Sequence, residues 1–150
     1  MQIHAENIPA NPIVYMRRTG AYGEQNAKLM EDMKEWIRRQ NLWDNNGTIY
    51  GMAQDDAAAT PPEQCRYDVC FVTDRTFDDT AIRYGTLPPG AYLIFEIPHT
   101  ADEVGRFWGS IGEVLAKAGK QLDKSRPILE RYQFAFVKKG ICEFCVPISA

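Results

Sequence analysis

Gly20-Ala21-Tyr22 recurs later in the same chain as Gly90-Ala91-Tyr92. A tryptophan follows each copy at nearly the same distance, Trp36 after the first and Trp108 after the second. Each tryptophan comes late in a stretch where apolar residues repeat at helical spacing. Matches that keep their order along a chain indicate that one supersecondary unit is present twice.

A third match extends the two copies beyond the helices. Arg66-Tyr67-Asp68-Val69-Cys70-Phe71-Val72 resembles Arg131-Tyr132-Gln133-Phe134-Ala135-Phe136-Val137, so we expect these two strands to be equivalent. The sequence therefore predicts two related units, approximately residues 12–73 and 88–148, within a single ligand-binding domain of residues 1–150. Duplicated units of this size commonly pack about a pseudo-two-fold axis, and the seam between them is a natural place for a ligand groove.

The first unit has the pattern of a strand, a helix and two further strands. Residues 13–16 are a short apolar run, and the apolar residues of 23–40 fall on one helical stripe. Asn45-Asn46-Gly47 is a turn signal before a strand at 48–53, and a polar loop leads to a strand at 65–73.

The second unit repeats this order. A strand at 91–97 precedes Thr100-Ala101-Asp102-Glu103, which has the spacing of a helix capping box. An amphipathic helix then ends near Gly119, and strands follow at 128–137 and 141–148. Two helices packed on antiparallel strands make an α+β fold. We therefore predict duplicated strand-helix-strand-strand units with pseudo-two-fold symmetry, one antiparallel sheet and a groove between the halves.

Composition excludes several classes of protein. The 150 residues carry a formal net charge of -3, so no overall basic field favours direct binding to nucleic acid. No stretch approaches the ~20 apolar residues that cross a bilayer, and the N-terminus lacks a signal segment. We expect a cytoplasmic protein without membrane association.

The four cysteines could suggest a zinc site, because they form two close pairs in the sequence. Cys65 and Cys70, like Cys142 and Cys145, lie in runs that resemble strands. An odd separation in a strand places two side chains on opposite faces. We therefore expect four free thiols, no metal site and no cofactor. The sequence also lacks a nucleophile elbow and a glycine-rich phosphate loop.

The ordered motifs together resemble the GyrI-like family of small-molecule-binding domains. In the first unit the motifs are Arg17-Arg18-Thr19-Gly20-Ala21-Tyr22, Trp36, Asp55-Asp56, Pro61-Pro62 and Cys65-Arg66-Tyr67-Asp68. In the second unit they are Pro88-Pro89-Gly90-Ala91-Tyr92, Trp108, Glu130-Arg131-Tyr132 and Pro147-Ile148. The match covers nearly the whole chain and departs at Ala57-Ala58-Ala59, where the family often continues with proline.

This resemblance implies a module that binds bulky, aromatic, often cationic compounds, as in the effector domains of Rob-type and MerR-type multidrug-responsive transcription regulators. No DNA-binding domain accompanies it in this sequence, so we expect a stand-alone binding module. The sequence leaves enzymatic activity open and favours passive binding. Some family members hydrolyse electrophilic cyclopropane-containing toxins, and a hydrolase that uses the same pocket is the alternative. One branch of the family is linked to DNA gyrase, which makes a protein partner the third hypothesis.

Glu130 is the most distinctive candidate residue. Strand alternation places it with Tyr132 on an apolar face, where an unpaired carboxylate is costly. The resemblance implies that Glu130 forms an electrostatic interaction with the positive charge of a ligand, or that it orients water if the protein is a hydrolase. The alternative is a structural carboxylate paired with an arginine such as Arg126. If residues 66–72 correspond to residues 131–137, the counterpart of Glu130 in the first unit is Cys65.

Aromatic side chains complete the predicted site, because tryptophan and tyrosine present flat apolar faces that attract cations. Core packing is the alternative for each tryptophan. The two histidines are expected outside the site, His99 in a loop and His4 in a terminal tail. The aromatic residues that we expect at the ligand are Trp108, Tyr67, Tyr132, Trp36 and Tyr50.

Overall fold

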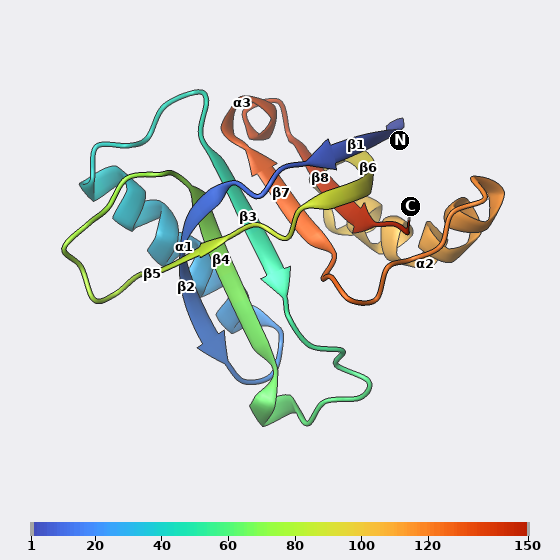
Figure 1. The fold of residues 1–150 in the computed structure, drawn as a ribbon, viewed down its shortest axis with the longest axis horizontal. Coiled ribbons are helices and arrows are strands. Elements are labelled where there is room, and N and C mark those ends of the chain that lie inside the picture. Colours follow the sequence, from blue (N-terminus) through green and yellow to red (C-terminus); the bar gives the residue numbers. More distant parts are fainter. Residues whose placement is uncertain (1, 150) are drawn as a thin grey trace.

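A computed structural model of the chain describes residues 2–149. One antiparallel sheet runs in the order β1-β6-β8-β7-β3-β4-β2-β5 and packs against helices (Figure 1). Its strands are β1 (Gln2–Ile8), β2 (Pro12–Thr19), β3 (Thr48–Ala53), β4 (Arg66–Val72), β5 (Arg83–Thr86), β6 (Gly90–Pro98), β7 (Leu129–Gln133) and β8 (Ile141–Pro147). The helices are α1 (Glu24–Arg39), α2 (Ala101–Lys117), the four-residue α3 (Phe134–Val137) and a 3-10 turn, η1 (Pro62–Gln64).

The same unit occurs twice. The sequence of elements β2-α1-β3-β4 is repeated as β6-α2-β7-β8, and the sheet order is alike on both sides of the central β3–β7 pair. At the start of α2, the Thr100 hydroxyl accepts a hydrogen bond from the Glu103 backbone N–H at 3.3 Å, as the capping signal predicts. The predicted α+β fold with duplicated strand-helix-strand-strand units is confirmed.

One predicted equivalence is wrong. Arg66–Val72 is strand β4, but residues 131–137 begin in β7 and end in α3, so the topological counterpart of β4 is β8. The predicted strand 128–137 stops at Gln133 because its partner β3 begins at Thr48, the residue paired with Gln133. Beyond that pair the chain has no strand to bond to on this side and coils into α3.

The counterpart of Glu130 in the first unit follows from the spacing of the repeats. A similar dipeptide stands at the start of each unit, Ile8-Pro9 for the first and Leu87-Pro88 for the second. These two dipeptides are separated by the same number of residues as Gly51 and Glu130. Gly51 and Glu130 also face each other across the central β3–β7 pair. The residue equivalent to Glu130 is therefore Gly51 and not Cys65, and the carboxylate breaks the symmetry at the centre of the sheet.

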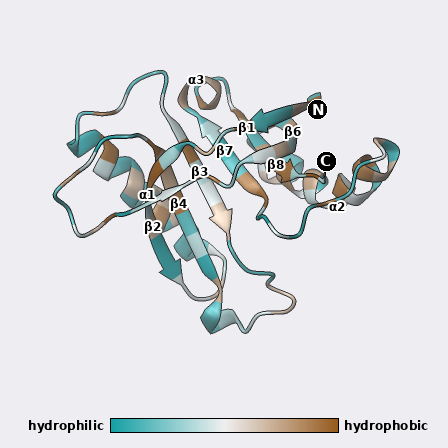
Figure 2. Cartoon of the chain, in the orientation of Figure 1, coloured by the Kyte–Doolittle hydropathy of each residue, from teal (hydrophilic) through white to brown (hydrophobic). Residues whose placement is uncertain are grey.

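The sheet contains two strands that the sequence did not predict, β1 at one edge and β5 at the other. β1 pairs with β6 although it leads directly into β2, and β5 pairs with β2 although it leads into β6. Residues 9–11 span at most about 14 Å, so the sheet must curl to bring its two ends together. His4 lies in β1 and not in a tail. β1 is an edge strand of largely hydrophilic residues (Figure 2), so the pattern of apolar residues gave no signal for it.

The curled sheet has two different faces. α1 and α2 lie on one face, α1 over the first unit and α2 over the second (Figure 1). We call this the helix face. The opposite, inner face encloses a separate apolar cluster to which both units contribute, including Ile13, Tyr50, Cys70, Tyr92 and Cys145.

All four cysteines are buried free thiols. Cys142 packs on the helix face and Cys145 on the inner face, as their odd separation predicts. Within residues 2–149, no group of three or more His, Cys, Asp or Glu side chains is placed to hold a metal ion. In the same range, no helix has the length and apolar character needed to cross a bilayer.

Candidate functional site

A cavity of about 600 Å³ opens on the helix face. Both units line it, since its walls come from α1, β3 and β4 on one side and from β7 and α3 on the other. Most of the lining is apolar or aromatic: Ala27, Met30, Trp43, Ile49, Tyr67, Tyr132, Phe134 and Val137.

Glu130 lies in this cavity and accepts two hydrogen bonds from phenol groups. The Tyr67 hydroxyl donates to Oε1 at 3.0 Å, and the Tyr132 hydroxyl donates to Oε2 at 2.8 Å. Burial, reinforced by the nearby Glu130 charge, raises the pKa of both tyrosines far above its ordinary value. Both phenols therefore stay protonated donors at physiological pH, and they supply hydrogen bonds to Glu130 without supplying positive charge.

The Glu130 carboxylate has no counter-ion in the described part of the chain, where no lysine, arginine or histidine forms an ion pair with it. Arg126, the partner that a purely structural role would favour, pairs with Asp123 at 3.0 Å instead. The hydrogen-bond donors to Glu130 are therefore neutral phenols, and no cationic side chain among residues 2–149 is paired with it.

Gly51 makes room for this arrangement. A Cβ atom at Gly51 would lie 2.3 Å from the Tyr67 hydroxyl oxygen and 3.2 Å from Glu130 Oε1. Glycine weakens the interior of a strand, and an isolated glycine there often marks a close approach. Gly51 was not predicted as part of the site, although a lone glycine within a predicted strand is a signal for it.

An aromatic stack forms another wall. The ring of Trp43 lies parallel to that of Phe134, with centroids 4.1 Å apart and planes inclined by 16°. Gly47 permits it, because a Cβ there would come within 2.3 Å of the Phe134 ring. Trp43 was missed because it lies in the loop after α1, where periodicity gives no signal. The expectation that His99 lies outside the site is wrong, because it also lines the cavity, with its ring centroid 5.5 Å from that of Tyr132.

Three of the predicted residues do not line the cavity. Trp36 is only 1% exposed, and its Nε1–H donates to Asp79 at 2.9 Å. Trp108 is half exposed on α2 and meets Phe144 edge-on. Tyr50 is buried on the inner face, where burial raises its pKa to about 12. Of the predicted set, the structure brings together Glu130, Tyr67 and Tyr132, and their role in binding remains a prediction.

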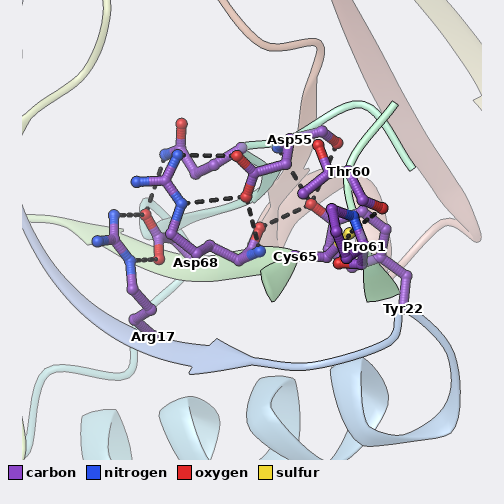
Figure 3. Close-up of polar contacts among 9 residues, drawn as sticks. Arg17, Tyr22, Asp55, Thr60, Pro61, Cys65 and Asp68 are labelled. Atoms are coloured by element: carbon purple, nitrogen blue, oxygen red, sulfur yellow. Dashed lines mark hydrogen bonds and ion pairs between the residues drawn. The ribbon is translucent and has the colours of Figure 1, made fainter. Parts of the chain in front are cut away.

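The inner face holds two further buried carboxylates, and each is bound by an arginine. Asp68 accepts hydrogen bonds from Arg17 at 2.7 and 2.9 Å and from the Gln54 amide at 2.9 Å (Figure 3). Glu143 accepts hydrogen bonds from Arg131 at 3.0 and 2.7 Å. These are closed structural ion pairs and offer nothing to a ligand.

Residues 1–149 match the model of the GyrI-like small molecule binding domain. The chain belongs to this family. It is 38% identical to YosT of Bacillus subtilis (strain 168), whose name describes a transcriptional regulator derived from the SPbeta prophage. The match covers 99% of this chain and 100% of YosT.

Solved structures share the GyrI-like fold. The EcmrR C-terminal domain matches with a TM-score of 0.72 at 12% identity, over 99% of this chain and 97% of that one. SAV2435 bound to tetraphenylphosphonium matches with a TM-score of 0.66 at 17% identity, over 100% and 95% of the two chains. The EcmrR chain in its complex with DNA matches with a TM-score of 0.75 at 11% identity, over 99% of this chain and 57% of that one.

Proposed function

We propose that this chain is a small-molecule-binding module for bulky aromatic cations, which it senses or sequesters, and that Glu130 meets the positive charge of the ligand. The observation that carries the proposal is the Glu130 carboxylate, which lines the cavity with two phenol donors and no ion-pair partner among residues 2–149. A cationic ligand would supply the missing charge. Residues 1–150 would then act as one domain, with the ligand between the units 12–73 and 88–148.

The size and lining of the cavity support this proposal. Pockets for small molecules commonly measure about 300–1,000 Å³ and are mostly apolar with a few polar groups, which describes this cavity. Trp43 and Phe134 offer flat faces for aromatic groups. A charge-assisted contact with Glu130 would contribute about 1.5–3 kcal/mol, or roughly ten- to a hundredfold in affinity.

The relatives point in the same direction. SAV2435, which shares the fold, is bound to tetraphenylphosphonium, a bulky aromatic cation. YosT carries a name that refers to transcriptional regulation, which fits a module that reports the presence of a ligand. These are properties of the relatives, and they motivate the choice of tetraphenylphosphonium as the first probe for this chain.

The test is titration calorimetry with tetraphenylphosphonium and with the neutral triphenylphosphine oxide. The variant Glu130→Gln keeps the size of the side chain and removes its charge. We expect it to bind the cation about ten- to a hundredfold more weakly and to leave the affinity for the neutral compound almost unchanged. Equal losses for both compounds would mean that Glu130 shapes the cavity without responding to ligand charge, and the proposal would fail.

Two tryptophans provide a matched control. Trp43→Ala removes the exposed ring of the aromatic stack and should weaken both compounds, because stacking serves either of them. Trp108→Ala makes the same change outside the cavity and should leave both affinities as they are. Thermal unfolding of each variant separates a loss of binding from a loss of folded protein.

A further inference from the structure

The cavity lining includes basic side chains, whose charge is opposite to that of Glu130. These are Lys34, Arg38 and Lys138. Lys34 is neutralised by Glu31 at 3.3 Å. Arg38 and Lys138 form no ion pair with a carboxylate anywhere in residues 2–149. The cavity lining therefore holds two exposed cations and one half-buried carboxylate that have no ion-pair partner among residues 2–149.

These two cations flank the aromatic stack. The Arg38 guanidinium lies 4.4 Å from the centroid of the Trp43 ring, which in turn stacks on Phe134. Lys138 follows α3 directly and donates a hydrogen bond to the Asn45 amide oxygen. Both residues lie at helix C-termini, where the helix dipole favours a positive charge. The dipole does not explain why both side chains line the cavity.

The charged groups come from separate elements around one cavity. Glu130 lies on β7, Arg38 in the last turn of α1, and Lys138 directly after α3. The aromatic stack of Trp43 and Phe134 lies beside the two cations. An aromatic ligand with charges of both signs can therefore meet Glu130 and the two cations from one position in the cavity.

We propose that the ligand of this cavity is zwitterionic. Its cationic end meets Glu130, its aromatic body lies against Trp43 and Phe134, and its anionic group, a carboxylate, sulfonate or phosphate, lies beside Arg38 and Lys138. This inference rests on the proposed function, because it takes Glu130 as the partner of a ligand cation. A purely cationic ligand would meet two like charges in the same cavity, and complementary charge is what selects partners and fixes their orientation.

A matched pair of dyes tests the inference. Rhodamine 110 and its methyl ester, rhodamine 123, share one cationic aromatic body, and only rhodamine 110 carries a free carboxylate. Fluorescence polarisation gives the affinity of the full chain for each dye. In the double variant Arg38→Gln/Lys138→Gln, we expect rhodamine 110 to bind about five- to tenfold more weakly, since each partly exposed ion pair contributes modestly. Rhodamine 123 should bind equally well or more tightly. Added salt should weaken rhodamine 110 more in the wild type than in the variant.

Two further variants control for structure. Arg38→Lys keeps the charge but loses the planar group over Trp43, and it should retain most of the preference for rhodamine 110. Lys117→Gln removes a cation from the outer surface of α2, where Lys117 pairs with Glu113 at 3.0 Å, and it should change neither affinity. Thermal unfolding shows whether each variant is folded.

The outcomes separate this inference from the function on which it rests. Equal losses for both dyes in the double variant, or no loss for rhodamine 110, overturn the zwitterionic ligand. If Glu130→Gln still weakens rhodamine 123 in that case, the proposed cation site stands. If neither dye binds the wild type, this inference falls, while the proposed function is judged by the titration with tetraphenylphosphonium. If Glu130→Gln leaves the affinities for both dyes and for tetraphenylphosphonium unchanged, the proposed function and this inference both fall.

Discussion

The carboxylates on the two faces of the sheet have different hydrogen-bond donors. On the inner face, Asp68 and Glu143 are each bound by an arginine. On the helix face, Glu130 is bound only by Tyr67 and Tyr132. An arginine supplies positive charge as well as donors, whereas a phenol supplies a donor alone. The inner pairs are therefore complete within the protein, whereas Glu130 has no ion-pair partner among residues 2–149.

The repeats show that this difference is built into the duplication. Gln54 and Gln133 are separated by the same distance in sequence as Gly51 and Glu130. Gln54 donates to Asp68 and Gln133 donates to Glu143, so both units contain a buried carboxylate bound by an equivalent glutamine. Glu130 has glycine as its equivalent. The structural pairs thus follow the symmetry of the fold, and the proposed binding carboxylate departs from it.

The largest effect is expected on the inner face. Arg131→Met removes the partner of Glu143, which is 2% exposed, and of Glu6. Loss of one partner leaves a charge uncompensated in the interior, and we expect the free energy of unfolding to fall by about 3–5 kcal/mol in urea denaturation.

Arg66→Met is the matched control for Arg131→Met, because Arg66 pairs with Asp55 at the surface at 2.9 Å. It should cost no more than about 1 kcal/mol. If Arg131→Met costs as little as this control, the inner pairs do not stabilise the fold, and the contrast between the two faces is lost.

An intermediate effect is expected at the centre of the helix face. Gly51→Ala places a methyl group against the Tyr67 hydroxyl, and such overpacking costs about 1–3 kcal/mol. The phenol would move away from Glu130, so the affinity for tetraphenylphosphonium should change with the stability. Gly105→Ala in α2 has open space around its Cβ and should stabilise the protein by about 0.5–1 kcal/mol. A Gly51→Ala protein as stable as the wild type would show that Tyr67 does not need this space.

The smallest effect on stability is expected from Glu6→Gln, because Glu6 is the more exposed partner of Arg131. The hydrogen bond from Arg131 holds the pKa of Glu6 below its ordinary value of 4.5. A carboxylate with a lowered folded pKa adds stability above its unfolded pKa and loses that contribution as the pH falls through the folded pKa. The melting temperature of Glu6→Gln should therefore fall less steeply than that of the wild type below about pH 4.5. Parallel curves would mean that this pair contributes nothing to acid stability.

Much of the fold could be predicted because its signals are local. The amphipathic stripes of α1 and α2 and the capping box at Thr100 each depend on neighbouring residues. β1 and β5 were missed because pairing with distant strands, and not apolar alternation, keeps them in the sheet. The match of residues 66–72 with 131–137 was false because the two segments are similar in composition but not in structure. β7 ends at Gln133, where its partner β3 begins, and the composition does not show this.

The site could be predicted only where its residues lie on regular strands. Alternation along β7 placed Glu130 and Tyr132 on one face, and the structure agrees. Helical spacing identified Trp36 and Trp108 but could not tell which side of each helix faces a cavity. Trp43 and Phe134 meet through a loop and a short helix, and no periodic pattern in the sequence brings these two elements together.

The most direct test of the central claim is a crystal structure of the complex with tetraphenylphosphonium. We expect the phosphonium centre to lie in the cavity within roughly 6 Å of a Glu130 carboxylate oxygen, the range over which opposite charges interact strongly. Its phenyl rings should contact Trp43 and Phe134. A ligand bound elsewhere, for example on the exposed face of Trp108, or one that turns its charge away from Glu130, would contradict the claim.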